Sequence, residues 1–181
     1  MPAKHLFIGL NPIPTSTCPV SLMVKRRLYT ANSGGSIPSR GTIGNNMKRI
    51  VVNGTFDILH IGHLRLLNYA RSIVNSYVYV LIDSDLRVRK LKGEHRPVNN
   101  EYERASLLHA LRSVDRVDVF ETDDELREYI RRFQPDLMIK GSDYRGQNII
   151  GQEYCQNIEF FDRLERYSTT NKIHAIINGN K

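Results

Sequence analysis

The 181-residue sequence has little cysteine and no long apolar segment. Its two cysteines, Cys18 and Cys155, are too few for a disulfide framework, which favours a reducing compartment and predicts a cytoplasmic protein. No apolar stretch approaches the roughly 18–20 residues that a membrane-spanning helix needs, so we expect no membrane partner. The sequence also contains neither a Walker A loop nor a G-x-G-x-x-G pattern, which excludes those two phosphate-binding signatures.

Acidic residues are absent from positions 1–46, which carry five of the basic residues: Lys4, Lys25, Arg26, Arg27 and Arg40. The chain has 26 basic and 19 acidic residues and a net charge of +7. Without those five, 21 basic residues face the same 19 acidic ones, a surplus of two. Since the remaining sequence is close to neutral, we expect no nucleic-acid partner.

Residues 1–46 are rich in Pro, Ser, Thr, Gly and Asn and show no sustained periodicity. This composition predicts a disordered, flexible and basic N-terminal extension, or translated sequence upstream of a true start at Met47. A basic, serine-bearing and acid-free segment also fits an organelle targeting leader. We favour the first interpretation, because Met47 leads straight into the first predicted strand, and we place the folded domain at 47–181.

From Met47 onward, β-branched apolar runs alternate with helical patterns. The predicted strands are 49–52, 77–82, 117–120, 137–139 and 158–161. The predicted helices are 60–73, 102–111, 124–133 and 168–177. Such alternation indicates an α/β fold, a Rossmann-like doubly wound parallel sheet of about five strands in a single domain. In these folds, ligands bind beyond the carboxyl ends of the strands.

The stretch from Gly54 to His63 follows the first predicted strand and opens the first predicted helix. His60 and His63 are three positions apart, so they share one face of the helix's first turn. That turn offers unpaired backbone N–H groups and the positive end of the helix dipole. Two imidazoles beside such amides favour a phosphate-handling site over a buried core role. A zinc site would need further ligands at a spacing that the sequence does not show, so we predict no metal held by the protein alone.

Three other segments follow strands or open a helix where the site is expected. The segment 90–97 is predicted as a loop whose Lys90, Lys92 and Arg96 clamp phosphates or form a solvated surface. Lys140 and Asp143 follow the fourth strand on the same rim, where an Asx turn is the alternative role for Asp143.

The segment 163–170, beginning at Arg163, contains three successive hydroxyls at the predicted start of the last helix: Ser168, Thr169 and Thr170. Ordinary capping accounts for one of them, and a second phosphate cradle accounts for all three. Asp57, three residues before His60, is predicted as the N-cap of the first helix. We therefore expect two distant chain segments to converge on one polyanion.

From about Met47 to the C-terminus, these motifs resemble the cytidylyltransferase family of HxGH nucleotidyltransferases. The stretch 54–63 resembles the family's first motif, and 163–170 resembles its closing R-x-x-x-x-S-T-T. The segments 92–97 and 140–144 are most similar to the adenylyltransferase domain of bacterial ADP-heptose synthase, and next to glycerol-3-phosphate cytidylyltransferase.

The resemblance implies that a phosphorylated small molecule attacks the α-phosphorus of a nucleoside triphosphate and releases pyrophosphate. It further implies a magnesium ion on the nucleotide and makes a homodimer plausible. Its implied catalytic residues are His60, His63 and Lys92. Its implied nucleotide-binding residues are Thr55, Phe56, Gly62, Arg163, Ser168, Thr169 and Thr170. We assign acceptor binding to Lys90, Arg96, Lys140 and Asp143.

The sequence leaves several alternatives open. The sequence does not decide between ATP and CTP as the donor. A sugar phosphate of the heptose 1-phosphate type is the leading acceptor, and glycerol 3-phosphate or another polyol phosphate is the alternative. From other classes, His-Ile-Gly-His is also a motif of class I aminoacyl-tRNA synthetases, and a nucleotide-binding module without turnover would keep the same fold. Intact His60, His63 and Lys92 favour the enzyme.

Overall fold

The computed structural model describes residues 46–162, 164 and 167–179. Its centre is a five-stranded sheet in which every pair of neighbours is parallel and the order is β3-β2-β1-β4-β5. The strands are β1 Lys48–Gly54, β2 Ser76–Asp83, β3 Arg116–Phe120, β4 Leu137–Gly141 and β5 Asn157–Phe161. This confirms the predicted α/β architecture.

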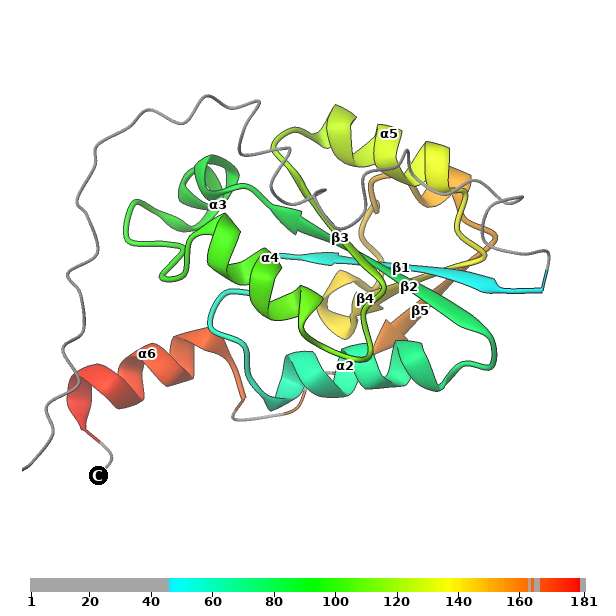
Figure 1. Cartoon of the computed structure of the whole chain (residues 1–181). Helices are drawn as coiled ribbons and strands as arrows, with labels where there is room; N and C mark the ends of the chain where they lie inside the picture. The colour runs from blue at the N-terminus through cyan, green and yellow to red at the C-terminus, as the bar shows by residue number, and fades with distance from the viewer. Residues whose placement is uncertain (1–45, 163, 165–166, 180–181) are drawn as a thin grey trace, which may run out of the picture.

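Helices cover both faces of the sheet (Figure 1). On one face, α2 (Ile61–Ser72) and α4 (Glu101–His109) pack over an apolar cluster that includes Ile50, Val52 and Ile139. On the other face, α5 (Asp123–Phe133) packs over a second cluster that includes Val51 and Met138. Because successive strand residues point to opposite faces, the continuous apolar runs predicted from the sequence supply both clusters.

Helix α3 (Asp85–Lys92) was not predicted. The segment 90–97 was expected to be a loop, but Lys90 and Lys92 are the last turn of this helix, and Gly93 is its C-cap with φ of 94°. Only Val88 of its eight residues is buried, so the helix lacks the apolar periodicity that reveals a helix in sequence. Ser84 caps it by accepting from the backbone N–H of Arg87.

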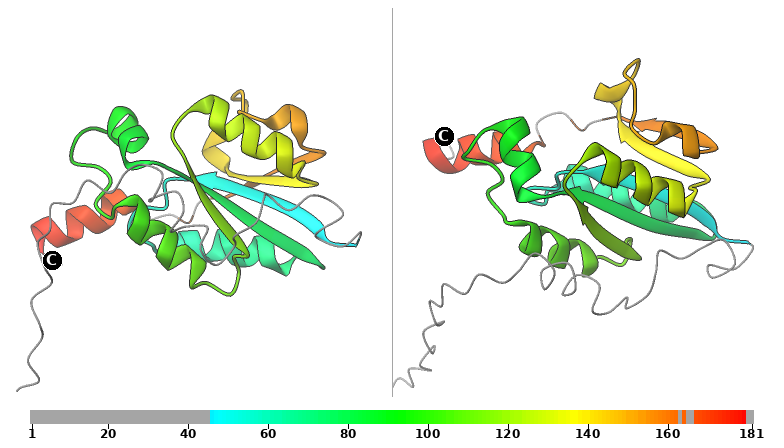
Figure 2. Two further views of the ribbon diagram at one scale, coloured as in Figure 1. Left: turned by 45° about the horizontal axis from the view of Figure 1, so that its top comes forward. Right: turned by 90° about the horizontal axis from the view of Figure 1, so that it is seen from above.

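The last helix, α6 (Thr169–Asn178), extends from the end of the sheet where α3 also lies (Figures 1 and 2). Two short 3-10 helices, η1 (Ser142–Tyr144) and η2 (Gln152–Tyr154), connect β4 to β5. In the order β3-β2-β1-β4-β5, the chain reverses direction across the sheet between β1 and β4. Ligands of open α/β sheets bind at such a switch, beyond the carboxyl ends of the strands. Within the described ranges, no helix combines the length and apolar character needed to cross a membrane.

Candidate active site

The turn between β1 and α2 has an unusual backbone. Phe56 and Ile58 adopt positive φ angles of 52° and 47°, which is rare for residues with side chains and rarest for a β-branched one. His60 is the N-cap of α2, with extended backbone angles and its Nδ1 accepting from the N–H of Gly62 at 3.1 Å. The prediction that Asp57 is the N-cap was therefore wrong. Strained backbone of this kind is concentrated at functional sites.

The two imidazoles lie together, as their spacing predicts. The rings of His60 and His63 are stacked, with centroids 3.8 Å apart and an interplanar angle of 21°. The ring of Phe56 lies against the ring of His63, with the two centroids 5.0 Å apart. Gly62 makes this arrangement fit, because a Cβ there would lie 2.9 Å from Cε1 of His60. Two polar rings are thus held at the beginning of a helix, where backbone amides also point outward.

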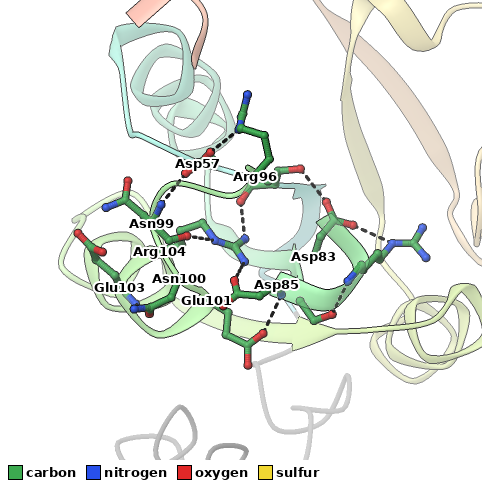
Figure 3. A network of polar contacts seen from close by, with 12 residues as sticks. Asp57, Asp83, Asp85, Arg96, Asn99, Asn100, Glu101, Glu103 and Arg104 are labelled. Carbon is green, nitrogen blue, oxygen red and sulfur yellow. Dashed lines mark hydrogen bonds and ion pairs between the residues drawn. The ribbon is translucent and has the colours of Figure 1, made fainter. Parts of the chain in front are cut away.

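Asp57 holds the turn instead of capping the helix. Its side chain is buried, with 1% exposed, and Oδ2 accepts from Nε of Arg96 at 2.9 Å. The same carboxylate accepts from the backbone N–H groups of Val98 and Asn99 at 3.0–3.1 Å. Figure 3 shows Asp57 between Arg96 and Asn99. The carboxylate therefore ties the turn to the segment that connects α3 to α4.

The beginning of α6 meets the same turn. Oγ1 of Thr169 donates to the backbone carbonyl of Asp57 at 2.6 Å, across 112 positions of sequence. Ser168 caps α6 by accepting from the N–H of Asn171 at 3.1 Å. The expected convergence of the two chain segments is confirmed. Arg163, predicted to bind the nucleotide, lies outside the described residues.

Thr55, at the beginning of the turn, is contacted from several elements. Its Oγ1 donates to Oδ2 of Asp83 at 2.9 Å and accepts from Nζ of Lys92 at 3.0 Å. The other carboxylate oxygen of Asp83 accepts from Nε of Arg87 at 2.9 Å. The ammonium of Lys92, at the end of α3, is therefore positioned beside the imidazole turn.

Arg104 is a further positioning residue that the sequence analysis did not single out. It is fully buried on α4 and donates to the carbonyl of Thr55 at 2.7 Å and to that of Asn99 at 3.0 Å. Its remaining nitrogen forms an ion pair with Asp85 at 2.7 Å (Figure 3). These partners are separated from it by as many as 49 positions, so no local pattern indicates the role.

Lys140 is a buried cation that lines the site. It is 6% exposed, and its Nζ lies over the ring of Tyr144 at 4.4 Å. Burial lowers its pKa to about 8, although the nearby carboxylates of Asp83 and Asp143 act in the opposite direction. A charged group in such surroundings needs an anion to offset its lost hydration.

These residues surround one cavity of about 610 Å³, within the range of small-molecule sites. Most of the predicted site residues line it: Thr55, Phe56, His60, Gly62, His63, Lys92, Arg96, Lys140, Asp143, Ser168, Thr169 and Thr170. Lys90 is exposed on α3 and is not among its lining residues. Asp83, Arg87 and Phe120 also line the cavity and were not predicted. Among the residues that the structure describes, no three His, Cys, Asp or Glu side chains are grouped to hold a metal ion.

Comparisons with known proteins show which family the chain belongs to. A family model described as cytidylyltransferase-like matches residues 51–173. Two proteins named bifunctional protein HldE, from Campylobacter fetus and Sulfurimonas denitrificans, are 42% and 43% identical over 127 and 129 residues. Those alignments cover 70% and 71% of this chain and 27% of each relative.

The HldE protein of Aliarcobacter butzleri is 40% identical over 187 residues, which cover 99% of this chain and 39% of the relative. This alignment therefore includes most of residues 1–46. The chain thus spans between about a quarter and two fifths of the length of these relatives.

A crystal structure of a lipopolysaccharide core biosynthesis protein from Thermoplasma volcanium matches the fold with a TM-score of 0.51. The match has 23% sequence identity and covers 68% of this chain and all of that one. At this identity the likeness supports the fold alone.

Proposed function

The chain belongs to the cytidylyltransferase-like family of nucleotidyltransferases, and on this premise we propose that it transfers the adenylyl group of ATP to a sugar 1-phosphate of the heptose type. The similarity to several HldE proteins at 40–43% identity supports this donor and acceptor class. The single observation that carries the chemistry is the hydrogen bond from Thr169 to the carbonyl of Asp57. It brings the N-termini of α2 and α6 to one cavity beside both imidazoles.

The reaction is a single displacement. An oxygen of the acceptor phosphate forms a bond to the α-phosphorus, and the bond from that phosphorus to the bridging oxygen of the β-phosphate breaks. Pyrophosphate leaves with the electron pair. Negative charge spreads over the phosphoryl and leaving oxygens in the transition state, so fixed donors stabilise it more than they stabilise the ground state.

The donors come from three elements. His60, His63 and the amides at the beginning of α2 face the α-phosphate, while Lys92 reaches the triphosphate from the end of α3. Thr169 and Thr170 receive the β- and γ-phosphates at the beginning of α6, where the helix dipole favours an anion. None of these residues forms a covalent intermediate.

Magnesium fits this site as a companion of the nucleotide. The Asp83 carboxylate is already bonded to Thr55 and Arg87. The phosphate oxygens of ATP are therefore the principal ligands we propose, as in other sites where Mg²⁺ keeps several waters. The ion supplies further neutralisation of phosphate charge.

A matrix of substrates tests the function. Each of ATP, CTP, GTP and UTP is combined with a heptose 1-phosphate, mannose 1-phosphate or glycerol 3-phosphate, and pyrophosphate and the nucleotide-linked product are measured. We expect ATP with the heptose 1-phosphate to give the highest kcat/KM. Preference for CTP with glycerol 3-phosphate would replace this proposal with a polyol-phosphate cytidylyltransferase. Pyrophosphate release with none of the pairs would refute both.

A further inference from the structure

The cavity lies at the carboxyl ends of the strands, and its two halves lie on opposite faces of the sheet. The imidazoles and the beginning of α2 belong to the face that α2 and α4 cover. Side chains alternate along each strand, and Val51, Leu81 and Met138 belong to the cluster under α5. Two residues further on, Asn53, Asp83 and Lys140 therefore project on the α5 side of the sheet. All three line the cavity.

Lys140 is the central feature of this half. Only 6% of its surface is exposed, and its ammonium lies over the ring of Tyr144. Within the described part of the chain, this ammonium forms neither a hydrogen bond nor an ion pair, although Asp83 and Asp143 act on it electrostatically. Buried cations in folded proteins are normally paired. An ammonium that lines a cavity and has neither a hydrogen bond nor an ion pair among the described residues is suited to an anion that arrives with the ligand.

A second observation lies beside it. Val52 and Ile139 are register partners of β1 and β4, so Asn53 and Lys140, the next residue of each strand, lie side by side. Oδ1 of Asn53 is buried and has no hydrogen-bond partner among the described residues. An unsatisfied buried acceptor is uncommon and costs free energy. A ligand hydroxyl is a suitable donor for Oδ1 of Asn53. The carboxylates of Asp83 and Asp143, which line the same cavity, also accept hydrogen bonds from hydroxyls.

We propose that the acceptor of the transfer reaction binds in this half of the cavity, with its phosphate on Lys140 and a hydroxyl on Asn53. The assignment rests on the proposed function, since it takes the acceptor to be a phosphorylated sugar. It also satisfies the geometry of displacement. The attacking and leaving oxygens are roughly in line at phosphorus, so the acceptor phosphate enters from the side opposite the pyrophosphate. The proposed pyrophosphate site is formed by the beginnings of α2 and α6 and by Lys92. Lys140 lies on the face of the sheet that α5 covers.

Phe120 and Arg87 complete this half of the cavity. The guanidinium of Arg87 lies over the Phe120 ring at 5.2 Å and is bonded to Asp83 and Asp123. Arg87 is therefore a positioning residue that holds Asp83. Phe120 offers an apolar wall to the C–H face of a sugar ring.

The test separates the acceptor from the nucleotide. Lys140→Met removes the ammonium from the cavity, and Lys48→Met is the matched control, because Lys48 is exposed at the opposite end of β1. We expect Lys140→Met to raise the KM of the acceptor roughly 10- to 100-fold, the range for losing one charge-assisted hydrogen bond. The KM of ATP should change by less than about threefold, and Lys48→Met should change neither.

Other outcomes overturn the proposal. If the KM of ATP rises instead, Lys140 binds the nucleotide, and if neither KM moves, it binds no substrate phosphate. Lys140→Gln, which is polar and uncharged, replaces the Met variant if that one does not fold. Asn53→Ala should raise the KM of the acceptor by a smaller factor, about three- to tenfold, and an unchanged value would remove Asn53 from the subsite.

A binding measurement keeps this inference separate from the proposed function. With the proposed pyrophosphate site filled by α,β-methylene-ATP, inorganic phosphate is titrated by calorimetry into wild type and Lys140→Met. Wild-type binding at least tenfold tighter than that of the variant supports the Lys140 subsite even if no sugar phosphate is turned over. Equal binding overturns it even if the enzyme is active.

Discussion

The end of β1 and the end of β4 lie next to each other in the sheet, yet they build the site in different ways. From Gly54, the last residue of β1, to His63, ten consecutive residues carry the two imidazoles, the glycine between them and the strained turn. At the end of β4, the environment of a single lysine, Lys140, is set by burial, Tyr144 and Asp83. The first half of the site is therefore formed by neighbouring residues of the sequence. The second half is formed only when distant segments pack together in the folded protein. The mutations below change one half at a time.

The largest effect is expected at the imidazoles. His60→Ala removes a donor from the transition state and frees the N–H of Gly62. We expect kcat to fall by roughly 10²–10³, the usual loss for one fixed donor, with an unchanged circular dichroism spectrum. His109→Ala, an exposed histidine at the end of α4, is the control. A variant with wild-type turnover would show that this half of the site does not carry the chemistry.

The next largest effect concerns the support beneath that turn. Asp57→Asn removes the charge that faces Arg96 and one acceptor of the 98–99 amides. Because breaking a buried pair strands its partner, and Arg96 is only partly buried, we expect unfolding free energy to fall by about 2–3 kcal/mol in urea titrations. Asp162→Asn breaks the exposed pair with Arg145 and should cost less than about 1 kcal/mol. Equal losses in the two variants would contradict the structural role of Asp57.

The β4 half of the site is distinguished by its pH dependence. The folded-state pKa of Lys140 is about 8, below its ordinary value of 10.5. The charged form is thus disfavoured by folding, so the penalty is complete below pH 8 and is relieved as the pH rises towards 10.5. Asp83 and Asp143 oppose the shift, and Arg87 adds to it.

Replacing Lys140 by Met should therefore flatten this part of the profile. Between pH 8 and 10.5, we expect the unfolding free energy of wild type to rise relative to that of Lys140→Met. Parallel profiles in denaturant titrations would show that the ammonium is not desolvated. Lys48→Met, on the exposed end of β1, should run parallel to wild type.

The smallest effect is expected at the contact between the β1–α2 turn and the beginning of α6. Thr169→Val keeps the side-chain shape but removes the hydrogen bond to the carbonyl of Asp57. One such bond contributes about 0.5–1.5 kcal/mol, so kcat/KM should fall roughly two- to tenfold. Thr169→Ser retains the hydroxyl and should recover most of the activity. If both variants behave alike, the position of α6 does not depend on this bond.

The sequence predicted much of this site because several of its signals are local. The spacing of His60 and His63 places two rings on one helix turn, and the hydroxyl run at 168–170 indicates a helix start. Local signals also misled. Asp57 is of a residue type that is common at N-caps, but His60, with extended backbone angles, occupies that position. Asp57 instead accepts a hydrogen bond from Arg96. Lys90 shares its segment with Lys92, yet the helical turn of α3 brings only Lys92 to Thr55.

The strands, their parallel arrangement and the imidazole turn follow from residue order alone, because period, glycine placement and helix capping act within a few positions of the chain. The buried Arg104 beneath Thr55, the contact between Thr169 and the turn, and the environment of Lys140 were decided by the tertiary structure. Desolvation and long-range hydrogen bonds depend on which segments pack together. Neighbouring residues in the sequence do not encode that information in any readable pattern.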